Sequence, residues 1–69
     1  MIFQERLIHL RKQEGLSQNA VAKEIKVAPR AYQNYEYGER EPKLSTLVKL
    51  ADLYGVTLDY LAGRTDTPD

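Results

Sequence analysis

The stretch that decides the fold runs from Leu16 to Pro42 and reads LSQNAVAKEIKVAPRAYQNYEYGEREP. Its first part combines a serine with apolar residues at helical spacing. The hydroxyl of Ser17 can accept a hydrogen bond from a free amide of the first turn, which favours the start of a helix there. We therefore expect a short helix from Ser17 to Ile25.

A second short helix, Pro29 to Tyr37, follows. Proline suits the first helical position, because its φ is already helical and its missing amide hydrogen would have no partner there. Gly38 can end the helix by adopting a left-handed backbone. Two helices of about 8 residues joined by the turn Lys26-Val27-Ala28 form a helix-turn-helix, whose second helix can enter the DNA major groove. Spacing alone leaves another interpretation open, a helical hairpin that only packs.

Tyr32 and Tyr35 give this second helix an inward face, because residues three apart lie on the same side of a helix. The outward face then carries side chains that suit base edges. Arginine can bond guanine, and glutamine or asparagine can bond adenine, through two parallel hydrogen bonds, whereas proline can only contact the thymine methyl group. An ordinary solvated polar surface is the alternative. The candidate base-reading residues are Arg30, Gln33, Asn34 and Pro29.

Apolar stripes predict three further helices. The first spans Ile2 to Glu14, and another runs from Lys43 or Leu44 to Tyr54. A last short helix, Leu58 to Ala62, has Thr57 as its cap. The chain is thus expected to be all-α, with one domain over residues 1–63 and a polar tail over residues 64–69 that frays or begins a linker. The stripe expected for the fourth helix is Leu44, Leu47, Leu50, Ala51 and Tyr54.

Composition excludes several classes of function. The 69 residues include no cysteine and one histidine, His9, so we expect neither disulfides nor a metal site. No apolar run approaches the ~18 residues of a membrane span, and the N-terminus does not resemble a signal peptide. No catalytic nucleophile set or glycine-rich phosphate loop is present, so we expect no enzyme, no cofactor and no evident small-molecule site. These absences predict a soluble cytoplasmic protein.

Charge gives mixed information about a DNA partner. The 10 basic and 10 acidic side chains cancel, which counts against DNA binding, because Lys and Arg must neutralise phosphates. Basic residues nevertheless gather in or beside the helix-turn-helix, and several acidic residues lie beyond it. Those C-terminal acidic residues are Asp52, Asp59, Asp66 and Asp69.

The sequence resembles the lambda-repressor-like, or XRE-type, helix-turn-helix family of bacterial and phage regulators. The matching residues are Leu16-Ser17-Gln18, Val21-Ala22, Val27, Tyr35-Glu36, Gly38 and Pro42, and then Leu47, Leu50-Ala51, Tyr54-Gly55-Val56 and Leu58-Asp59-Tyr60-Leu61. The resemblance implies a five-helix lambda-repressor-like DNA-binding domain that binds double-stranded DNA in a sequence-specific manner. It also implies a transcriptional regulator, in particular a repressor, that binds a palindromic operator as a homodimer.

The resemblance and the charges together indicate contact residues. In similar proteins the residue at Gln18 binds a phosphate and braces the recognition helix, and Glu36 has a structural role, for which Arg40 is one candidate partner. The last helix has more apolar residues than so small a core can bury, which predicts a dimer interface there. The further phosphate candidates are Asn19, Tyr37, Arg40, Lys43, Arg11 and Lys12. The candidate dimer interface is Val56, Leu58, Tyr60 and Leu61.

Two residues of the turn depart from the family pattern. Lys26 stands where glycine is usual and where a positive φ is often needed, so it should cost roughly 1 kcal/mol relative to glycine. Ala28 stands where serine or threonine is preferred, and alanine cannot cap a helix. One amide therefore depends on water or on a DNA phosphate.

The same fold also suits an alternative function. An antitoxin or an anti-repressor uses such a domain to bind a partner protein, and the zero net charge favours this alternative. The salt dependence of DNA affinity separates the two functions, because binding through phosphates weakens steeply with salt.

Overall fold

The computed structural model describes residues 1–68, and these residues form five helices and no strand. Every expected helix is present, and no helix end differs from its prediction by more than one residue. No helix in this described range is long and apolar enough to cross a membrane. The helices are α1 (Phe3–Gln13), α2 (Gln18–Glu24), α3 (Pro29–Tyr37), α4 (Leu44–Tyr54) and α5 (Leu58–Leu61).

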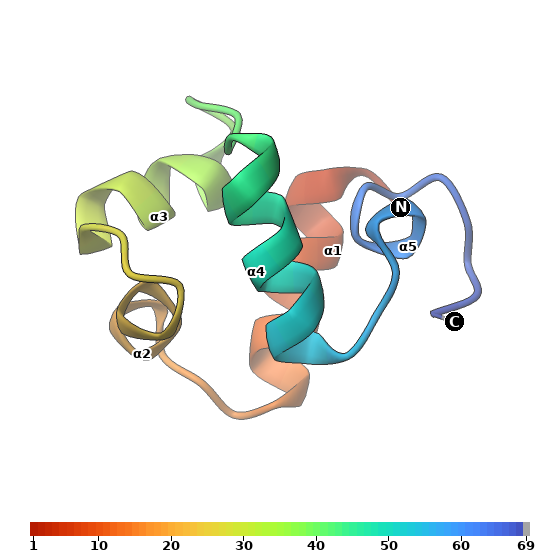
Figure 1. Ribbon diagram of the computed structural model, residues 1–69, viewed down its shortest axis with the longest axis horizontal. Helices are drawn as coiled ribbons and strands as arrows, with labels where there is room; N and C mark the ends of the chain where they lie inside the picture. The colour runs from red at the N-terminus through yellow and green to blue at the C-terminus, as the bar shows by residue number, and fades with distance from the viewer. Residues whose placement is uncertain (69) are drawn as a thin grey trace.

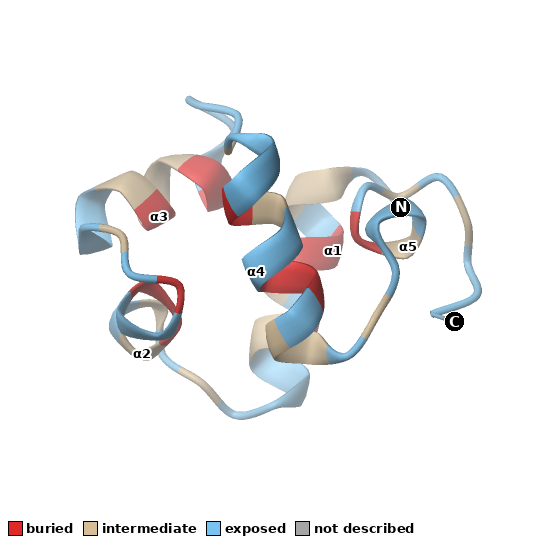
Figure 2. Cartoon of the chain, viewed as in Figure 1, coloured by how far each residue is buried: buried red, intermediate tan, exposed pale blue. Residues whose placement is uncertain are grey.

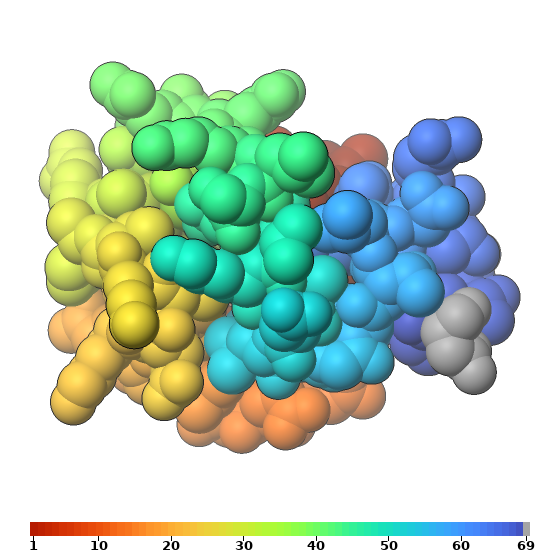
Figure 3. Space-filling view, in the orientation of Figure 1, coloured from red at the N-terminus to blue at the C-terminus, as the bar shows by residue number. Residues whose placement is uncertain are grey.

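The helices divide the molecule into two sides (Figure 1). α4 crosses the front of the view with α1 behind it, α2 and α3 lie to the left, and α5 lies to the right with both chain ends. α3 packs against α1 and α2, whereas α5 packs against α1 and α4. In the space-filling view, α4 covers the middle of the front face (Figure 3). α3 therefore lies on the opposite side of the molecule from the chain ends.

The core lies between the helices, and all five contribute buried side chains (Figure 2). The inward direction of the two tyrosines is confirmed, because Tyr32 is fully buried, Tyr35 is 9% exposed and their rings meet edge to face at 6.4 Å. The stripe predicted for α4 was wrong at its first residue. Leu44 is 69% exposed, because it shares an outer face with Val48, one turn later, which is also exposed.

The turn between α2 and α3 has the backbone that its sequence predicts. Lys26 has a φ of 60°, and it is the one non-glycine residue with positive φ among residues 1–68. The amide of Val27 donates to the carbonyl of Ala22 at 3.0 Å, and the amide of Lys26 donates to that of Lys23 at 3.2 Å. These two bonds close α2 in the way that a left-handed glycine usually closes a helix. Lys26 thus carries the steric cost of a Cβ atom at this position.

The C-terminal segment makes contacts with the rest of the fold that the sequence did not predict. The guanidinium of Arg6 donates to the carbonyl of Thr65 at 3.4 Å and to the carboxylate of Asp66 at 3.3 Å. The same guanidinium lies 3.8 Å from the centre of the Tyr60 ring. The segment therefore lies against α1 and α5, and Asp69 falls outside the described residues. Sequence patterns could not predict these contacts, because the partners are about 60 residues apart along the chain.

The predicted dimer interface also needs correction. Leu61 is fully buried in the core of its own chain, so it cannot contact a partner. Val56 and Tyr60 are half-buried and pack against the same core. Only Leu58 of this set, 40% exposed, presents an apolar side chain to solvent. The short helix α5 buries more apolar surface than expected because it packs against both α1 and α4.

Replacing Lys26 by glycine should stabilise the fold. Lys26→Gly removes the Cβ atom from a left-handed backbone, and we expect the free energy of unfolding to rise by about 1 kcal/mol after the entropy cost of glycine is included. Urea denaturation measures this change. Lys26→Ala is the matched control: it removes the charge and keeps the Cβ atom, so its stability should stay within ~0.5 kcal/mol of the parent. Equal gains in both variants would show that charge, and not backbone strain, is responsible.

Candidate nucleic-acid interface

The outward face of α3 brings the four candidate base-reading residues together. Pro29 and Arg30 are exposed in its first turn, and Gln33 and Asn34 are half-buried one turn later. Tyr37, 63% exposed, continues the same face at the end of the helix. The buried tyrosines occupy the opposite side, so the polar side chains cannot turn inward. The face therefore presents one guanidinium and two carboxamides to solvent.

The N-terminus of α3 lacks a side-chain cap. Ala28 occupies the cap position and makes no side-chain hydrogen bond. The first amides of any helix have no carbonyl partner within it, and they form the positive end of the helix dipole. The start of α3 is thus suited to receive an anion, and it lies directly beside Arg30.

A buried carboxylate joins the three helices around this face. Glu36, 4% exposed, accepts hydrogen bonds from α1, α2 and α3. Arg11 donates through Nε at 2.6 Å and through Nη2 at 3.2 Å. Gln18 donates through Nε2 at 3.0 Å, and the hydroxyl of Tyr32 donates at 2.5 Å. These four bonds fix α3 relative to its two neighbours, so the direction of the outward face is set by the core.

The bonds also determine the ionisation of the group. Burial by itself raises the pKa of Glu36, but the hydrogen bonds from Arg11, Tyr32 and Gln18 outweigh burial and hold that pKa below its ordinary value. The carboxylate in turn raises the pKa of Arg11 through their hydrogen bond. Burial, with the bond to Glu36, raises the pKa of Tyr32. At neutral pH Glu36 is therefore ionised, Arg11 is charged and Tyr32 keeps the proton that it donates.

Two expectations about this cluster need correction. Arg11 was a candidate phosphate contact, but its guanidinium binds Glu36 and also donates to the carbonyl of Leu16 at 3.1 Å. Its side chain is 14% exposed, so Arg11 belongs to the fold and not to the surface. The partner of Glu36 is accordingly Arg11 and not Arg40. The contact of Glu36 with Tyr32, one helical turn earlier, could have been predicted from spacing, whereas Arg11 is 25 residues away.

The remaining phosphate candidates belong to α1, α2, α3 and the loop that follows α3. Gln18 is half-buried and braces α3 through Glu36, as the resemblance implied. Asn19 is the second residue of α2, and Lys12 lies near the end of α1. Arg40 and Lys43 lie in the loop from α3 to α4. Within residues 1–68, none of these cations forms an ion pair. The candidates that are exposed are Asn19, Lys12, Arg40, Lys43 and Tyr37.

The five helices and the exposed face of α3 define a helix-turn-helix domain of the lambda-repressor-like type. A family model described as helix-turn-helix matches residues 7–61, so the chain belongs to the helix-turn-helix family. The DNA-binding domain of the P22 c2 repressor is similar in structure, with a TM-score of 0.84 and 29% identity over 97% of this chain and 91% of that one. A transcriptional regulator from Listeria innocua also has a TM-score of 0.84, with 33% identity over 88% of this chain and 57% of that one.

Curated relatives carry names of regulators of transcription and not of enzymes. The uncharacterized HTH-type transcriptional regulator YobD of Bacillus subtilis is 43% identical over 65 residues, which cover 94% of this chain and 58% of the relative. The cryptic phage CTXphi transcriptional repressor RstR of Vibrio cholerae is 38% identical over 69 residues, which cover 100% of this chain and 62% of the relative. The chain thus spans less than two thirds of the length of these relatives.

Removing the charge of Glu36 should destabilise the fold and change its response to acid. Glu36→Gln leaves the half-buried Arg11 without its counter-charge and weakens the hydrogen bonds to residue 36, and we expect a loss of about 2 kcal/mol at pH 7. Folding lowers the pKa of Glu36, so the ionised carboxylate stabilises the folded parent. This contribution is complete at pH values above the pKa that Glu36 has in the unfolded chain, and it is lost as the pH falls below about 5. The difference in unfolding free energy between parent and variant should therefore shrink from pH 7 to pH 3.

Urea denaturation across that pH range provides the measurement. Glu24→Gln is the matched control, because Glu24 is exposed and makes no side-chain hydrogen bond or ion pair among the described residues. Its stability should follow that of the parent at every pH. A pH-independent difference between the parent and Glu36→Gln would show that Glu36 does not titrate differently in the folded state.

Proposed function

We propose that the chain binds double-stranded DNA in a sequence-specific manner and acts as a transcriptional repressor in the cytoplasm. The observation that carries this proposal is the outward face of α3, which presents Arg30, Gln33 and Asn34. Tyr32 and Tyr35 are buried on the opposite side of the helix and keep this face turned outward. Bidentate donors on one exposed helix face are what base readout in the major groove requires. The names of RstR and of the P22 c2 repressor domain support the same function.

The proposed complex places α3 in the major groove. Arg30 bonds guanine, Asn34 or Gln33 bonds adenine, and Pro29 contacts a thymine methyl group. The amides at the start of α3 and a ring of surrounding side chains bind the phosphates. All of these side chains except Gln18, which is half-buried and donates to Glu36, are exposed and form no ion pair within residues 1–68. That ring consists of Gln18, Asn19, Tyr37, Arg40, Lys43 and Lys12.

We further propose that two chains bind a palindromic operator as a symmetric homodimer. A two-fold symmetric pair presents its α3 helices to half-sites about one helical turn apart. Leu58, with Val56 near it in the chain, supplies the apolar contact, because Leu58 is 40% exposed. It begins α5, which lies on the side of the molecule away from α3 (Figure 1). A core this small also gains stability from an apolar interface with a second chain.

Selection of bound duplexes from a random DNA pool tests the function directly. We expect a motif with two-fold symmetry whose half-sites contain a guanine and an adenine. Affinity for that motif should fall roughly a thousandfold between 50 and 200 mM salt if about six phosphates are contacted. No enriched motif, together with no salt dependence, would contradict DNA binding and favour the protein-interaction alternative, such as an antitoxin, with which the net charge of zero agrees.

Arg30→Ala should separate base reading from backbone contact. We expect a loss of ~1–3 kcal/mol in binding the selected site and a relaxed preference at one base pair, because Arg30 bonds a base edge. Lys12→Ala is the matched comparison and should weaken all sequences equally while it lowers the salt slope by about 1. Affinity measured on the selected site and on its single-base variants distinguishes the two. Uniform weakening by Arg30→Ala would assign Arg30 to phosphate instead.

A further inference from the structure

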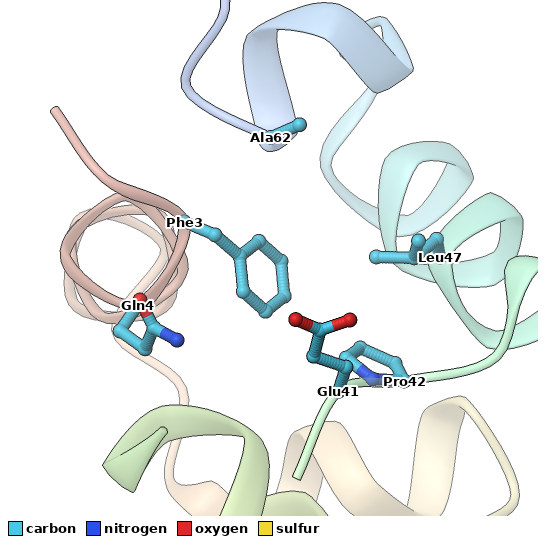
Figure 4. A pocket seen from close by; sticks show the side chains of 6 residues that line it. All are labelled: Phe3, Gln4, Glu41, Pro42, Leu47 and Ala62. Atoms are coloured by element: carbon cyan, nitrogen blue, oxygen red, sulfur yellow. The ribbon is translucent and has the colours of Figure 1, made fainter. Parts of the chain in front are cut away.

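A small pocket lies where α1, the loop between α3 and α4, α4 itself and the residue after α5 meet. It has a volume of about 170 Å³. Most of its wall is apolar, and two polar side chains, a carboxamide and a carboxylate, complete it. The residues that line it are Phe3, Gln4, Glu41, Pro42, Leu47 and Ala62 (Figure 4). None of these residues has a part in the proposed DNA contacts.

The carboxylate of Glu41 has no hydrogen-bond or ion-pair partner among the residues that the structure describes. Figure 4 shows it directed into the space between Phe3 and Leu47, and not away from the pocket. Among residues 1–68 it forms no ion pair and accepts no hydrogen bond, although Arg40 and Lys43 lie in the same loop. Glu41 is an exposed residue, so its carboxylate keeps contact with water and contributes a negative charge at the open side of an otherwise apolar pocket. A cation in the pocket could pair with that charge while its apolar part lies against the walls.

We propose that this pocket binds a small organic ammonium ion. The ammonium group pairs with Glu41, and its alkyl chain lies against Phe3, Pro42, Leu47 and Ala62. The volume is close to that of a protein cavity of about 150 Å³ that holds benzene, so it accommodates about six non-hydrogen atoms.

The chemistry of the lining favours an organic cation over other small ligands. The ring of Phe3 attracts a cation at its face. An inorganic cation would find too few oxygen ligands among these walls. An anion is repelled by Glu41, and a neutral alkane leaves the carboxylate unpaired.

Occupation of the pocket has a consequence for DNA binding, and this consequence alone rests on the proposed function. Glu41 lies between Arg40 and Lys43, two of the proposed phosphate contacts. An ammonium ion bound to Glu41 removes a negative charge that opposes the approach of phosphate. The ligand and the operator should therefore each raise the affinity of the chain for the other.

The test is a titration of the chain with n-butylammonium chloride, followed by the amide signals in a nitrogen–proton NMR correlation spectrum. We expect saturable shifts at Phe3, Leu47 and Ala62 with a dissociation constant on the order of millimolar, because so few ligand atoms are buried. 1-Butanol has almost the same shape without the charge, and it should bind at least several-fold more weakly. No saturable shifts, or equal affinity for both compounds, would overturn the proposal.

Two variants of the loop sharpen the test. Glu41→Gln keeps the size of the side chain and removes its charge, so the affinity for butylammonium should fall about tenfold. Glu39→Gln is the matched control, because Glu39 is exposed in the same loop and does not line the pocket, and its affinity should equal that of the parent. Equal loss in both variants would show that the loop attracts cations only by its overall charge. Binding is measured without DNA, so its failure and the failure of operator binding are separate results.

Discussion

The structure depends on one buried carboxylate, that of Glu36. A buried charge raises the free energy of the folded state unless hydrogen bonds and an opposite charge compensate it. The donors that compensate Glu36 come from three helices. The bonds from Arg11, Gln18 and Tyr32 to Glu36 tie α1, α2 and α3 together in the observed arrangement. The cluster therefore acts less as a source of stability than as a constraint on geometry. It determines which face of α3 points outward, and thus which side chains are available to DNA.

This constraint lets the two sides of the molecule differ in character. On one side, α3 shows polar side chains above an uncapped helix start, and the helix is held from behind by Tyr32 and Tyr35. On the other side, α5 and the C-terminal segment pack on α1 through Arg6, close to both chain ends. The loop from α3 to α4 connects the proposed interface to the pocket beneath Glu41. A ligand there would act on the phosphate contacts by charge, without moving the helices.

Local physics explains what could be predicted from the sequence. Ser17 and Thr57 do cap their helices, and Lys26 does adopt the positive φ expected at its position. The errors share a different cause. Leu44 and Leu61 have the same apolar chemistry and both lie within apolar stripes, yet one is exposed and the other is buried. The exposure of each side chain depends on which neighbours the folded chain places beside it. Spacing along the sequence does not contain that information.

The sequence by itself determined the five helices, their ends and the polar face of α3, because caps, glycines and helical periodicity act over one or two turns. Only the tertiary structure decided that Arg11 pairs with the buried Glu36, that the C-terminal segment docks against Arg6 and that Glu41 lines an apolar pocket. The physical reason is that charged side chains are long and can pair with any partner that folding brings near. Which partner that is follows from the packing of the whole chain.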